Sequence, residues 1–63
     1  MHTVDPAKPA LVRRDGRWLD GDLRAWRRDL DGWLGYVCYA ESAGIRYLEW
    51  VDAERVRLHS PPT

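Results

Sequence analysis

The sequence contains a single cysteine, Cys38, and no long hydrophobic run. One cysteine excludes a disulfide within the chain, whereas secreted domains of this size are usually held together by several. No apolar run approaches the roughly 18 residues that a membrane-spanning helix needs. The N-terminal residues also lack a basic stretch followed by an apolar one, which is the pattern of an export signal. We therefore expect a cytoplasmic protein with no membrane partner.

Neither sign of charge is in excess. The chain has ten basic and ten acidic residues, a formal net charge of zero, and a pI of about 6.7. Dedicated nucleic-acid domains often have a pI above about 9. All but one of the basic residues are arginines, which suit fork-like hydrogen bonding and stacking on aromatic rings better than lysine does. Charge alone therefore identifies no partner.

Phenylalanine is absent, while the chain has four tryptophans and three tyrosines. These rings carry a polar group and suit half-buried positions, so they favour a binding face, although a small core can also use tryptophan simply as filler. A chain of 63 residues buries enough surface for one core only. We expect a flexible N-terminal segment over 1–9, a folded domain over 10–59 and a C-terminal tail over 60–63.

Turn signals recur at short intervals and predict a meander of short strands. These signals are Asp15-Gly16, Asp20-Gly21, Asp31-Gly32 and Ala43-Gly44. Four residues, 52–55, can form one tight 3-10 turn that redirects the chain before a last strand. The pattern predicts an all-β, five-stranded SH3-like barrel with strands over 11–14, 22–28, 33–40, 45–51 and 56–58.

A helix near 22–31 is the competing interpretation and would make the fold α+β. Leu19, Leu23, Trp26 and Leu30 recur at helical spacing, and Gly32 could end the helix. Against it, Gly21 would lie in the first helical turn, and loss of this strand would leave a small sheet with an open edge. We therefore favour the strand.

Three segments resemble SH3-like small barrels of the Tudor-like type. The first is the run Leu-Val-Arg-Arg-Asp-Gly-Arg-Trp-Leu-Asp-Gly-Asp-Leu over 11–23, in which a strand leads through a glycine turn to Trp18. The others are Gly-Tyr-Val-Cys-Tyr over 35–39 and Trp-Val-Asp-Ala-Glu-Arg-Val-Arg-Leu over 50–58. The chain is also similar to small uncharacterised actinobacterial proteins with the same Gly-x-Trp opening. The resemblance implies a binding module for methylated side chains, peptides or nucleic acid.

Strand alternation divides the side chains between two faces. If Val37 is in the core, Tyr39 joins it and Tyr36 faces solvent. On the second strand, alternation would place Arg24, Trp26 and Arg28 on one outer face, suited to phosphate contact and base stacking. The alternative is a solvated face whose arginines cover Trp26 and pair with nearby aspartates. The binding residues that we predict are Trp18, Arg24, Trp26, Arg28, Tyr36 and Arg46.

Catalytic patterns are lacking. Cys38 and His59 could form a thiolate pair, but no third group orients them, and a buried, inert cysteine is the better interpretation. We expect no metal and no cofactor, because ligand spacing and a phosphate-binding loop are both missing. The sequence therefore predicts a non-catalytic adaptor that binds a protein or peptide, with nucleic acid as the alternative partner and a homodimer as a further option.

Overall fold

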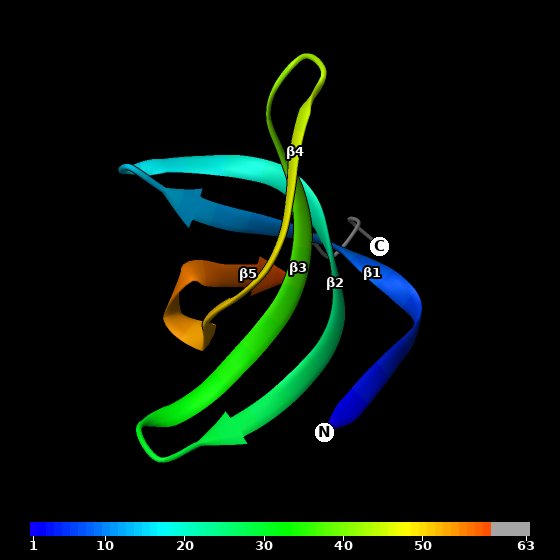
Figure 1. The fold of residues 1–63 in the computed structure, drawn as a ribbon, viewed down its shortest axis with the longest axis vertical. Helices are drawn as coiled ribbons and strands as arrows, with labels where there is room; N and C mark the ends of the chain where they lie inside the picture. The colour runs from blue at the N-terminus through cyan, green and yellow to red at the C-terminus, as the bar shows by residue number, and fades with distance from the viewer. Residues whose placement is uncertain (59–63) are drawn as a thin grey trace, which may run out of the picture.

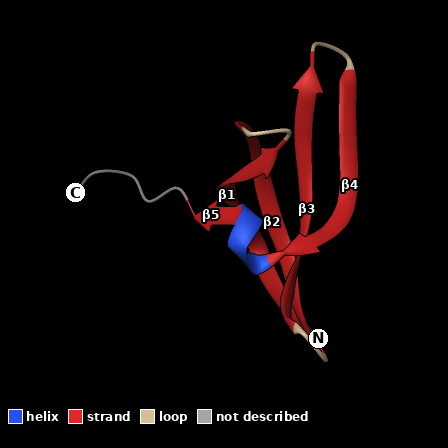
Figure 2. Ribbon diagram, turned by 90° about the vertical axis from the view of Figure 1, so that its left-hand side faces the viewer, coloured by secondary structure: helices blue, strands red, loops and turns tan. Residues whose placement is uncertain are grey.

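A computed structural model of the chain describes residues 1–58. It contains β1 (His2–Arg14), β2 (Arg17–Asp29), β3 (Gly32–Ser42), β4 (Ile45–Asp52), the 3-10 turn η1 (Ala53–Arg55) and β5 (Val56–Leu58). The strands form one antiparallel sheet in the order β4-β3-β2-β1-β5. The sheet is strongly curved, as Figures 1 and 2 show. The all-β prediction, with five strands and a 3-10 turn before the last, is confirmed.

Three two-residue hairpin turns set the register of the first four strands. In the first, Asp15 and Gly16 have φ angles of 51° and 76°, between the paired residues Arg14 and Arg17. Positive φ at both central positions gives the twist that joins two strands tightly, and it explains the Asp-Gly sequence. The other two turns occupy 30–31 and 43–44. Asp20-Gly21, which we predicted to be a turn, instead lies inside β2.

Most strands are longer than the sequence indicated. β1 begins at His2, so it includes most of the segment 1–9 that we expected to precede the folded domain. Its first residues pair with β2, with His2 opposite Trp26, and the register shifts between Thr3 and Lys8. The strand bends sharply in this region, as Figure 1 shows. β1 therefore pairs with β2 in two separate stretches, 2–3 and 8–14, on either side of its bend.

The helix considered near 22–31 is not formed, because β2 is paired along its length with β1 and β3. The helical spacing of its apolar residues has another origin. Leu23 lies opposite Val37, and Ala25 lies opposite Tyr36, so Arg24 is an extra residue in the ladder. Such a β-bulge interrupts the alternation of faces. Leu23 and Trp26 consequently both contact the core.

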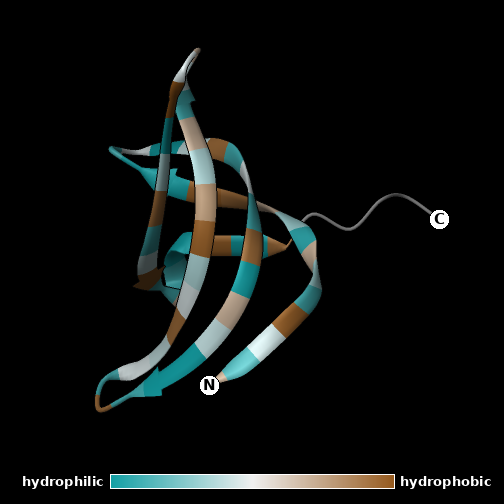
Figure 3. Ribbon diagram, turned by 45° about the vertical axis from the view of Figure 1, so that its right-hand side comes forward, coloured by the Kyte–Doolittle hydropathy of each residue, from teal (hydrophilic) through white to brown (hydrophobic). Residues whose placement is uncertain are grey.

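The core lies on the inner, concave side of the sheet. Val12, Val37 and Tyr39 are fully buried there, which confirms the predicted inward face of β3. Figure 3 shows hydrophobic bands, in brown, between paler and teal ones along the strands. The buried cluster consists of Ala10, Val12, Leu23, Val37, Tyr39 and Val51, and partly buried Val4, Leu19, Trp26, Tyr47 and Val56 pack around it. No helix within residues 1–58 has the length and apolarity needed to cross a lipid bilayer.

Candidate functional site

The bulge at Arg24 separates the residues that we predicted to form one arginine and tryptophan stripe. Trp26 lies opposite Gly35 and packs against the core cluster on the inner side. Arg24 instead pairs with Asp22, at 3.0 Å between Nε and Oδ1. The prediction that Arg24, Trp26 and Arg28 share one outer face is therefore wrong. The extended backbone was predicted correctly, but a single extra residue reversed the direction of the indole.

The outer face of the sheet carries a different aromatic cluster. Tyr36 and Trp50 are paired across β3 and β4, with ring centroids 4.8 Å apart. The guanidinium carbon of Arg27 lies 4.7 Å from the centroid of the Trp50 ring. We call Arg27, Tyr36 and Trp50 the outer-face cluster. Tyr36 was predicted to lie on this side of β3, whereas Arg27 and Trp50 were not among the predicted binding residues.

Of the three remaining predicted residues, Arg28 is exposed on β2 opposite Trp33, and Arg46 and Trp18 lie apart from the rings of the outer-face cluster. Arg46 donates from Nη2 to the Sγ atom of Cys38 at 3.5 Å. Trp18 is covered by Arg57, whose guanidinium carbon lies 4.5 Å from the ring centroid. Cys38 itself is buried, and His59, its predicted partner, lies outside the described residues. The predicted site residues thus do not form one continuous surface.

An apolar groove of about 460 Å³ opens where β1, β2, β3 and η1 meet. Its walls are His2, Trp26, Trp33 and Ala53. The rings of His2 and Trp33 lie 5.6 Å apart, and Trp33 is 40% exposed. Partly buried aromatic side chains around an open apolar hollow are typical of ligand sites.

Gly35 explains why Trp26 can reach this groove. A Cβ atom at Gly35 would lie 3.2 Å from the Trp26 ring and 3.1 Å from Cδ1 of Leu23. These distances are shorter than ordinary van der Waals contact, so the absence of a side chain lets the indole lie against the backbone of β3. The bulge in β2 turns Trp26 inward, and Gly35 provides the space for it.

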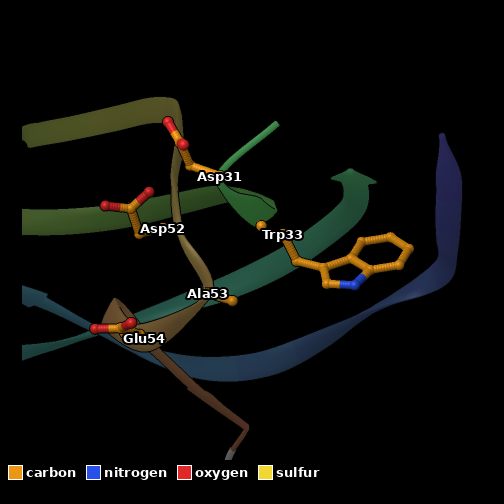
Figure 4. Close-up of a pocket in the computed structure, with 6 residues that line it drawn as sticks. Asp31, Trp33, Asp52, Ala53 and Glu54 are labelled. Carbon is orange, nitrogen blue, oxygen red and sulfur yellow. The ribbon is translucent and has the colours of Figure 1, made fainter. Parts of the chain in front are cut away.

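An acidic hollow of about 370 Å³ continues from the apolar groove and shares Trp33 and Ala53 with it. Asp31, Asp52 and Glu54 line this hollow. Figure 4 shows their carboxylates to one side of Ala53, with the Trp33 indole extending to the other. Within the described part of the chain, none of the three carboxylates forms an ion pair. The combined site therefore has an aromatic half and a negatively charged half.

The acidic half was missed because it depends on a contact between distant segments. In the pairing of β3 with β4, Leu34 lies opposite Asp52, the last residue of β4. This pairing brings the β2–β3 turn, with Asp31, beside η1, which follows Asp52. The available sequence signal was that Asp-Gly-Trp and Trp-Val-Asp-Ala-Glu each place an aspartate two residues from a tryptophan.

A polar network on the inner side satisfies the one buried phenol. Nη1 of Arg14 donates to the Tyr39 hydroxyl at 2.7 Å, and this hydroxyl donates to Oε1 of Glu49 at 2.5 Å. Nη1 of Arg14 also lies 3.6 Å from the Glu49 carboxylate, and its guanidinium stacks 4.5 Å from the Tyr47 ring centroid. These contacts hold the partners of a buried polar group in place, which is a structural role.

This network predicts a loss of stability at alkaline pH. Burial, together with the hydrogen bond to Glu49, raises the pKa of Tyr39 above its ordinary value. The folded protein then binds the phenolic proton more tightly than the unfolded chain. The contribution of this protonated hydroxyl to the unfolding free energy is therefore complete below about pH 10 and is lost as pH rises through the folded-state pKa. We expect the unfolding free energy of Tyr39→Phe to fall less steeply than that of the wild type above this pH.

Urea unfolding followed by tryptophan fluorescence at several pH values measures this difference. Tyr36→Phe is the matched control, because Tyr36 lies against Trp50 on the outer side of the sheet, outside this network. Equal slopes for the wild type and Tyr39→Phe above about pH 10 would contradict the prediction.

Comparisons of the chain with protein-family models, curated proteins and solved structures find no match. Within residues 1–58, no group of three or more histidine, cysteine, aspartate or glutamate side chains is arranged to hold a metal ion. The functional proposal therefore depends on the chemistry of the groove and the faces of the sheet.

Proposed function

We propose that this protein is a non-catalytic adaptor that binds an extended, basic segment of a partner protein in the apolar groove and its acidic extension. One observation carries the proposal: Trp33 and Ala53 belong to both hollows, so an apolar surface of aromatic rings passes directly into a surface of three carboxylates. An apolar side chain of the partner would occupy the first hollow. A neighbouring lysine or arginine would lie beside the carboxylates.

The shapes and charges of the two halves support a peptide over a small molecule. Both hollows are open and lie side by side along the surface, which suits a segment that contacts them with successive side chains. Asp31, Asp52 and Glu54 have no cation of their own in the described chain, so a basic partner supplies the missing charge. Trp33 is the central contact, and exposed tryptophans are among the residues that contribute most to binding.

The test is selection from a random peptide library displayed on phage, followed by fluorescence titration with the selected peptides. We expect peptides that combine apolar and basic residues. Trp33→Ala should weaken their binding about thirtyfold, the loss that a central tryptophan typically causes. Trp18→Ala is the control, because Trp18 lies outside both hollows. Failure to select such peptides, or equal binding by Trp33→Ala, would exclude the groove as the site.

Nucleic acid remains a second candidate partner, and the outer-face cluster is the observation that favours it. An arginine over an indole beside a tyrosine offers both a cation and rings for base stacking. The balanced charge of the chain weakens this alternative. If it holds, single-stranded RNA or DNA should bind with an affinity that falls steeply with salt, and Arg27→Ala should reduce it. Binding that is insensitive to salt and to Arg27→Ala would exclude it.

The proposed fold at finer detail is a partly open SH3-like barrel. The strand order, with β5 beside β1 and η1 immediately before β5, supports it, as do the bends of β1 and β2. The resemblance of 11–23, 35–39 and 50–58 to such barrels points the same way. In this arrangement the central part of β4 keeps a free edge.

A further inference from the structure

The edge of β4 is the basis of an inference that does not depend on the groove. Among the strands that the structure describes, in the order β4-β3-β2-β1-β5, β4 is hydrogen-bonded to β3 alone. Within residues 1–58, the backbone groups on its other side therefore have no strand partner. Figure 2 shows β4 at one border of the sheet, with its C-terminal end curving toward η1. An unprotected edge strand is a template for pairing with another strand.

β4 has only some of the features that prevent such pairing, namely its charged residues Arg46, Glu49 and Asp52. Its sequence, Ile-Arg-Tyr-Leu-Glu-Trp-Val-Asp, contains no proline and no lysine. Ile45 and Leu48 are 48% and 50% exposed, which is high for large apolar residues on a free edge. The register shift between β3 and β4 lies between Ala40 and Ser42, so the ladder that pairs 34–40 of β3 with 46–52 of β4 is regular. The strand is thus free of proline, regular and long enough to add a neighbour.

The two faces of β4 differ in chemistry. Leu48 and Trp50 lie opposite Cys38 and Tyr36, on the outer side of the sheet, and Arg46 contacts Cys38 on the same side. Tyr47, Glu49 and Val51 point to the inner side, where Glu49 accepts from Tyr39 and Val51 is buried. Any partner strand must match both patterns.

We propose that the occupant of this edge is β4 of a second copy of the chain, paired antiparallel about a twofold axis at Leu48. In this register Leu48 of one copy faces Leu48 of the other on the outer side. Arg46 then faces Trp50, an attractive cation–π pair, and Tyr47 faces Glu49, a hydroxyl opposite a carboxylate. Closed twofold pairing of this kind is the commonest form of assembly.

Neighbouring registers fit less well. An axis at Glu49 would place Arg46 opposite Asp52, which is attractive, but it would also place the two Glu49 carboxylates directly opposite each other at the axis, and like charges in that position are destabilising. An axis at Tyr47 would place Ile45 opposite Glu49 and Arg46 opposite Leu48, which loses the cation–π pair. The register at Leu48 is therefore favoured by hydrophobic contact at the axis and by the absence of opposed like charges.

Pairing through one strand of eight residues buries a small area, so the dimer is a weak one that forms at high concentration. Sedimentation velocity over a series of concentrations should show a reversible equilibrium between monomer and dimer. Leu48→Asp, which places two carboxylates at the axis, should weaken the dimer at least about tenfold. Leu58→Asp is the matched control, because Leu58 is 46% exposed on β5, the opposite edge of the sheet.

A cross-linking experiment tests the register independently of the stability of the aspartate variants. In a Cys38→Ala background, Leu48→Cys should form a disulfide-linked dimer when oxidised glutathione is added, because directly opposed residues lie within disulfide distance. Ile45→Cys, which faces Val51 in this register, should not. A monomer at all concentrations, a dimer unaffected by Leu48→Asp, or faster cross-linking at position 45 than at 48 would each overturn the proposal.

Discussion

Gly21→Ala is expected to lower the free energy of unfolding by about 3 kcal/mol, although it adds only one methyl group. Gly21 faces Tyr39 across the β2–β3 ladder. A Cβ atom there would overlap the backbone oxygen of Cys38 and would lie 2.7 Å from Cβ and 2.9 Å from Cα of Tyr39. Backbone atoms in the middle of a sheet cannot move aside as the end of a flexible side chain can. Urea denaturation followed by circular dichroism measures the loss.

Gly16→Ala is the matched control for this substitution. Gly16 has a φ of 76° in the β1–β2 turn, but nothing lies within 4 Å of an added Cβ atom. Its cost should come from backbone strain alone, about 1 kcal/mol. A cost at Gly21 no larger than the cost at Gly16 would show that β2 and β3 are not in close contact at Tyr39.

The size of this effect matters because the protein is small. A chain of 63 residues has a total unfolding free energy of roughly 3–9 kcal/mol at typical values per residue. Loss of about 3 kcal/mol would therefore remove a large part of the stability and could leave a substantial unfolded fraction. Functional variants in the groove are best made at exposed positions such as Trp33, where the fold tolerates change.

The strands were predictable because their turns are local. Asp15-Gly16 and Ala43-Gly44 lie between paired residues, and the alternation of Val37, Cys38 and Tyr39 was enough to assign their faces. Asp20-Gly21 has the same dipeptide sequence as the first turn but lies inside β2. Its glycine is needed for close approach to Tyr39, and this contact joins residues far apart in the sequence.

The candidate site was much less predictable. The position of Trp26 depends on the bulge at Arg24. No residue at this bulge has a positive φ angle, so the bulge needs no glycine that would mark it in the sequence. Alternation alone placed this indole on the outer face, whereas the helical spacing of Leu19, Leu23 and Trp26 was correct about their shared side and wrong about its cause. The acidic half of the site needed the pairing of Leu34 with Asp52, which only the assembled sheet provides.

Leu23→Ala tests how the core supports the groove, and we expect it to cost about 3 kcal/mol. Leu23 is 1% exposed, and its Cδ1 atom lies 3.1 Å from the position of a Cβ atom at Gly35, beside the Trp26 ring. Truncation leaves a cavity next to this indole, so Trp26 can sink inward and its fluorescence should change along with stability. Leu30→Ala is the control, because Leu30 is 100% exposed in the β2–β3 turn and its loss should cost less than about 0.5 kcal/mol. Similar stability of the two variants would contradict the inward direction of Leu23, and with it the bulge that directs Trp26 into the groove.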